Sequence, residues 1–97
     1  MPVVCNLGVF SREEALRHDR LTKELLAARL EDRALPDGRA FRFPAGDDWH
    51  RKLAEWVALE SRCCPFLSFA LEAGLEAVWL TVTAEGEGRR FLQEHLL

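Results

Sequence analysis

The sequence predicts a two-layer α+β domain, in which helices pack on one face of a four-stranded, mainly antiparallel sheet. Segments that alternate polar and apolar residues are interleaved with segments of helical periodicity, which favours layered packing of helices on a sheet. The last two alternating segments flank a short glycine-containing turn, as in a hairpin. With 97 residues and 48% apolar content, the chain is large enough for one core and too small for two. We therefore expect a single domain over residues 1–97, with the order β-α-β-α-β-β-α.

The first part of the chain predicts one strand and one long helix. Residues 3–7 are mostly apolar, with Cys5 at their centre, and we expect a strand there. Ser11 and Glu14 have the spacing of a capping box, in which each side chain satisfies the backbone N–H of the other. The helix that they open is expected to continue to about Asp32.

The second part begins with a turn at residues 36–38, after which residues 39–43 alternate and place Phe41 and Phe43 toward the core. A helix capped by Asp47 or Asp48 should end at Cys63 or Cys64, because a residue before proline is disfavoured in the α region. The remaining elements are expected to be strands over 67–71 and 78–83 and a short helix over 88–95.

Glu60 lies where an apolar residue is expected. At about 100° per residue, the apolar side of the helix from Trp49 onward continues through Glu60, with Cys63 and Cys64 on either side of it. A buried carboxylate is unfavourable unless it is paired, hydrogen-bonded or bound to a cation. Glu60, Cys63 and Cys64 therefore form the centre of the candidate site.

Three interpretations of this cluster remain open. The cysteines and the carboxylate are the ligands of a metal or metalloid ion, or the thiols are redox-active, or the cysteines are buried structural residues and Glu60 accepts hydrogen bonds. A helix C-terminus and a nearby carboxylate both raise a thiol pKa and favour a cation. These features favour an ion over a reactive nucleophile. Adjacent helical residues point about 100° apart, so both cysteines reach one ion only if the helix unwinds before Pro65.

The whole chain resembles a small bacterial family of uncharacterised stand-alone domains, with one cysteine near the N-terminus and a Glu-x-x-Cys-Cys-Pro-Phe signature. The resemblance implies no established activity, only that the motif looks like a heavy-metal or thiol site, to which Cys5 also belongs. The matching segments are Cys5-x-Leu7, Gly38-Arg-Ala-Phe-Arg-Phe43, Glu60-x-x-Cys63-Cys64-Pro65-Phe66-x-x-Phe69, and Trp79-Leu80 followed by a late glycine turn.

Composition excludes several classes of function. The net charge is −3 and the basic residues are dispersed, so we expect no nucleic-acid partner. No segment has the length or the flanking charges of a membrane span or a signal peptide. We expect a cytoplasmic protein with reduced thiols, and three cysteines fit a disulfide framework poorly.

We therefore predict a domain that binds a metal or metalloid ion through Cys5, Glu60, Cys63 and Cys64, with zinc or a softer thiophilic ion as the ligand. The alternative is a non-catalytic dimeric scaffold with buried cysteines. Trp79 should lie on the sheet face away from the helices, and an exposed tryptophan there favours a homodimer. An acid–base enzyme is disfavoured, because neither His18, expected to be solvated, nor His50 is a convincing acid–base partner for the cysteines.

Overall fold

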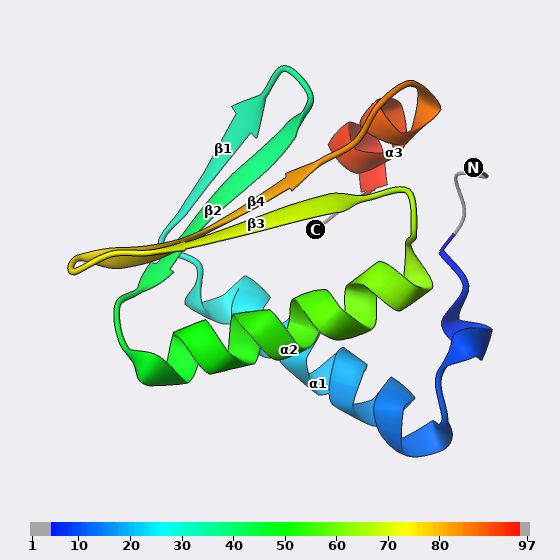
Figure 1. The fold of residues 1–97 in the computed structure, drawn as a ribbon, viewed down its shortest axis with the longest axis horizontal. Helices are drawn as coiled ribbons and strands as arrows, with labels where there is room; N and C mark the ends of the chain where they lie inside the picture. The colour runs from blue at the N-terminus through cyan, green and yellow to red at the C-terminus, as the bar shows by residue number, and fades with distance from the viewer. Residues whose placement is uncertain (1–4, 96–97) are drawn as a thin grey trace.

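The computed structural model describes residues 5–95 of the chain, and the side chains of residues 5–92. The described chain forms two layers, with a four-stranded sheet on one side and helices α1 and α2 covering one of its faces (Figure 1). The elements are η1 (Leu7–Val9), α1 (Arg12–Ala28), β1 (Glu31–Leu35), β2 (Gly38–Pro44), α2 (Asp47–Cys63), β3 (Ser68–Ala73), β4 (Ala77–Thr83) and α3 (Glu87–His95).

The strands form one antiparallel sheet in the order β1-β2-β4-β3. β3 and β4 are the predicted hairpin, and β4 also pairs with β2 so that Phe41 lies opposite Leu80. Both residues are fully buried. The predicted α+β class and antiparallel sheet are confirmed.

The predicted order of elements is wrong at the N-terminus. Residues 5–7 do not form a strand, since η1 begins at Leu7, and the rest of the expected first strand lies outside the described residues. The first strand of the sheet is β1, whose residues were expected in part at the end of a helix. Pairing with β2 overrides the weak strand preference of this charged segment, and Glu31 and Asp32 form ion pairs with Arg42 and Arg39 of that strand.

One hydrophobic core lies between the sheet and the helices. β2 contributes Phe41 and Phe43, as predicted, and α2 contributes Leu53 and Trp56, all with exposed fractions of 1% or less. α3 packs against β2 and adds Leu92 to the same cluster. Burial of large apolar side chains of this kind is the main stabilising term of the fold.

Three features set the ends of α1 and α2. The capping box of Ser11 and Glu14 is present at the start of α1, as predicted. At the start of α2 the predicted aspartate cap is wrong, because Gly46 occupies the N-cap with φ of 134°, a conformation that glycine adopts without strain. α2 ends at Cys63, as predicted, and Cys64 has left the helix with φ of −122° and ψ of 76°.

The other face of the sheet is not covered by α1 or α2 (Figure 1). Trp79 alternates along β4 with the buried residues Val78 and Leu80 and is half-buried, with the guanidinium of Arg33 5.1 Å from its ring centroid. Within the described residues, no helix has both the length and the apolar character needed to cross a membrane.

Candidate thiol and metal site

Four potential ligand residues meet at the C-terminal end of α2. Glu60 and Cys63 lie in its last turn, Cys64 follows it, and Cys5 comes from the N-terminal segment. One ligand atom from each residue lies within 4.8 Å of the ligand atoms of the others. The structure thus brings together all four residues that the sequence predicted, although Cys5 is distant from the others in the chain.

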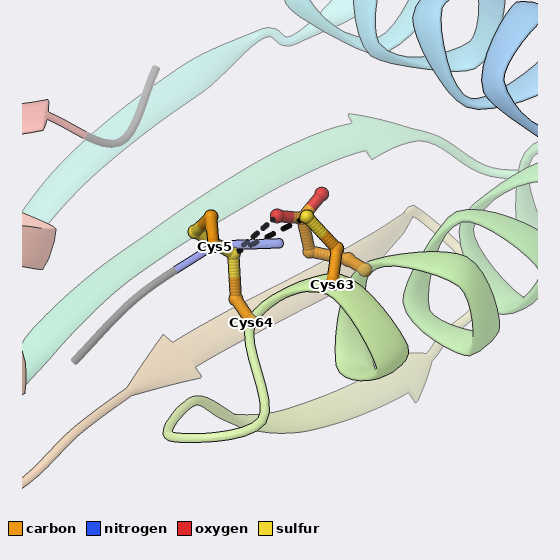
Figure 2. Close-up of side chains that lie close together, drawn as sticks. Cys5, Cys63 and Cys64 are labelled. Carbon is orange, nitrogen blue, oxygen red and sulfur yellow. Dashed lines mark hydrogen bonds between the residues drawn. A yellow bond between two sulfur atoms is a disulfide. The ribbon is translucent and has the colours of Figure 1, made fainter. Parts of the chain in front are cut away.

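The expectation that all three thiols are reduced is wrong for two of them. Cys5 and Cys64 form a disulfide across 59 residues of sequence, with their Cα atoms 4.4 Å apart. Figure 2 shows the bond between their sulfur atoms, with Cys63 beside it. The odd number of cysteines is accounted for by one bridge and one free thiol.

Non-covalent contacts also hold the N-terminal segment against α2. The backbone N–H of Asn6 donates a 2.8 Å hydrogen bond to the carbonyl of Cys63. Arg62 donates to the carbonyl of Val9 over 2.9 Å and to the carboxylate of Glu14 over 2.6 Å. Cys5 is therefore kept near the end of α2 by contacts that do not depend on the disulfide.

Cys63 is the free cysteine, and it is almost completely buried, with 1% exposed. Its Sγ lies 3.9 Å from Sγ of Cys64. Burial and the nearby Glu60 carboxylate raise the pKa of the Cys63 thiol, against a smaller opposing effect of the Asn6 backbone N–H. This agrees with the sequence argument against a low-pKa nucleophile at this position.

Glu60 is the one charged residue buried in the core of the described chain, with 6% exposed. Its Oε1 atom lies 3.1 Å from Sγ of Cys64. A disulfide sulfur carries no proton, so this contact becomes a hydrogen bond only when Cys64 is a thiol. On the other side, His18 Nε2 donates a 2.6 Å hydrogen bond to Oε2, since a carboxylate only accepts.

His18 was missed by the sequence analysis, which placed it in solvent. Only 15% of its side chain is exposed, and its ring packs 5.2 Å from that of Phe10. A usable signal existed, because His18 precedes the buried Leu21 and Leu25 by three and seven residues and so lies on the same helix face. The charged residues around His18 in the sequence led to the expectation that it is solvated.

The geometry suits a thiophilic ion once the disulfide is reduced. Two sulfurs bound at about 2.3 Å to one tetrahedral ion lie about 3.8 Å apart. The Cys63 and Cys64 sulfurs are 3.9 Å apart in the structure. Because Cys64 has left the helix, both side chains point to the same side, which two adjacent residues within an α-helix cannot do.

No protein-family model matches the chain, and neither a curated protein nor a solved structure shows significant similarity to it. The resemblance to the Glu-x-x-Cys-Cys-Pro-Phe domains therefore stays a prediction. The case for a function rests on the chemistry of the four residues and of His18.

Proposed function

We propose that the reduced protein binds one thiophilic metal or metalloid ion, such as zinc or trivalent arsenic, through Cys5, Cys63 and Cys64, with Glu60 as an oxygen ligand. The observation that carries this proposal is the grouping of four ligand atoms within 4.8 Å, from two segments far apart in sequence. Three thiolates and one carboxylate are a ligand set that zinc accepts, and softer ions prefer the thiolates still more strongly.

The disulfide makes binding dependent on redox state. In the oxidised form two of the three sulfurs are bonded to each other, and they are no longer thiolate ligands. Reduction supplies both of them without a large movement, because Asn6 and Arg62 keep the N-terminal segment in place. The two states of one site thus differ in affinity for an ion, which suits sequestration, delivery or sensing.

Thermal unfolding of the reduced protein tests the proposal. A ligand that binds only the folded state stabilises it by RT ln(1 + [L]/Kd), about 2.7 kcal/mol at a hundredfold excess over Kd. With a phosphine reductant present, zinc, Cu(I) or arsenite should raise Tm of the wild type. The gain should fall in Glu60→Gln and nearly vanish in the double variant Cys63→Ser, Cys64→Ser. An unchanged Tm with all three ions, with three free thiols confirmed by titration, would contradict the proposal.

A structural role for the cysteines is the second candidate, and the disulfide itself favours it. A bridge between the N-terminal segment and α2 stabilises the fold whether or not an ion binds. In that case the protein is a non-catalytic binding or scaffold module. Native mass spectrometry of the reduced protein separates the two candidates, since only the first gives a species that retains one ion per chain.

A further inference from the structure

The two cysteines of the disulfide differ in their access to solvent. Cys5 is exposed, whereas Cys64 is fully buried. A disulfide is opened when an external thiolate attacks one sulfur and displaces the other as the leaving thiol. An external thiol therefore reaches the bond from the Cys5 side and is excluded from the Cys64 side.

We propose that Cys5 is a site of reversible modification, at which a low-molecular-weight thiol opens the disulfide by forming a mixed disulfide with Cys5. This proposal does not rest on ion binding and stands whether or not the reduced protein takes an ion. It assigns two different roles, with the exposed Cys5 as the sulfur that is attacked and the buried Cys64 as the sulfur that leaves.

The chemistry balances without a further oxidant. The thiol RSH gives up its proton, its sulfur bonds to Sγ of Cys5, the bond between Cys5 and Cys64 breaks, and one proton ends on Sγ of Cys64. One disulfide has replaced another, with no net oxidation. A second RSH then displaces Cys5 as a free thiol and forms RSSR, so that two external thiols supply the two electrons that reduce the protein.

Cys63 does not open the bridge by attack on Cys64. Its attack on Cys64 would join two adjacent residues, whose Cα atoms are about 3.8 Å apart, closer than the usual span of about 4.4–6.8 Å for a disulfide. Cys63 is also buried, which withholds it from external reagents. The sulfur of the bridge that external thiols reach is therefore that of the exposed Cys5.

The contacts of the N-terminal segment make the reaction reversible. After the mixed disulfide forms, the Asn6 hydrogen bond and the Arg62 contact with Val9 still hold Cys5 near Cys64. The Cys64 thiol then competes intramolecularly with external thiols for the Cys5 sulfur, at a high effective concentration. Attack by Cys64 expels RSH and restores the original bridge.

Trapping the mixed disulfide in the wild-type protein tests the proposal. The oxidised protein is incubated with reduced glutathione under native conditions, quenched in acid at a series of times, and mapped by peptide mass spectrometry. We expect glutathione on Cys5 and none on Cys63 or Cys64 at early times. An adduct first found on Cys63 or Cys64 would overturn the proposal. So would the absence of any Cys5 adduct after the time in which glutathione fully reduces the denatured protein.

Two matched variants test the same asymmetry without the bridge. Cys64→Ser leaves Cys5 free, and Cys5→Ser leaves Cys64 free, and each is incubated with oxidised glutathione. We expect Cys5 to be modified at least about tenfold faster than Cys64 in the folded proteins, because exposure controls thiol reactivity. In denaturant the two rates should converge. Similar rates in two variants that are folded by circular dichroism would contradict the assigned roles.

Discussion

Nε2 of His18 and Oε2 of Glu60 lie 2.6 Å apart across the contact between α1 and α2. This hydrogen bond satisfies one oxygen of a carboxylate that is almost completely buried, and the other oxygen faces Cys64. Unpaired buried charges are among the most costly features of a fold. His18 therefore links the stability of the helix pair to the candidate site.

Removal of this partner should destabilise the protein. We expect His18→Ala to lower the free energy of unfolding of the oxidised protein by about 1–3 kcal/mol, because the buried Oε2 of Glu60 then loses its donor. His18→Gln retains an N–H donor and should lose less. His50→Ala is the control, since His50 is exposed, and should change the value by less than about 0.5 kcal/mol. Urea unfolding measures all three, and a His18→Ala variant as stable as wild type would contradict the inference.

The disulfide should account for a large share of the stability. It closes a loop of 59 residues, for which the chain-entropy model gives about 4 kcal/mol at 25 °C. Adding a phosphine reductant, with no metal present, should therefore lower the urea midpoint of wild type and of Cys63→Ser, which keeps the bridge. Cys5→Ser should unfold at the same midpoint with and without reductant. If the reductant also lowers the urea midpoint of Cys5→Ser, the loss of stability has a cause other than the disulfide.

Gly38 should be required for pairing of β2 with β4. A Cβ atom at Gly38 would lie 1.9 Å from the backbone oxygen of Val82, so Gly38→Ala must displace the strand. Overpacking of this kind costs about 1–3 kcal/mol. Gly74→Ala is the matched control, because its nearest neighbour, the oxygen of Ala77, would be at an ordinary 3.5 Å. Equal thermal stability of the two variants would contradict the close approach.

The elements predicted correctly from the sequence are those whose apolar residues recur at the spacing of a strand or a helix. The alternation at Phe41 and Phe43, and that of β4, identified core strands, and the helix stripe placed Glu60 inside the protein. The edge strand β1 was missed because its Glu-Asp-Arg start has no apolar alternation, and its structure is imposed by β2. Local pattern cannot reveal a strand that tertiary pairing defines.

Local sequence pattern also explains which part of the candidate site was predicted. Glu60, Cys63 and Cys64 share one helix end, so their proximity follows from local geometry. The bridge to Cys5 depends on a distance between Cα atoms that only the tertiary fold sets. The odd number of cysteines led to the expectation that all three are reduced. That number is equally compatible with one disulfide and one free thiol, which is what the structure has.

The link between Glu14 and Arg62 should make stability depend on acid pH. The hydrogen bond from Arg62 holds the pKa of Glu14 at about 2, below its ordinary 4.5, with a further contribution from the backbone of Ser11. Because the pKa is lower in the folded state, the stabilisation is complete above pH 4.5 and is lost as pH falls toward 2. We expect Glu14→Gln to have a lower free energy of unfolding than wild type at pH 6. This difference should disappear as the pH falls from 4.5 to 2. Glu13→Gln is the control for loss of a negative charge, since Glu13 is exposed in the same turn. Thermal unfolding from pH 2 to 7 measures each variant, and a Glu14→Gln difference that stays constant across that range would show that the Arg62 contact contributes nothing through charge.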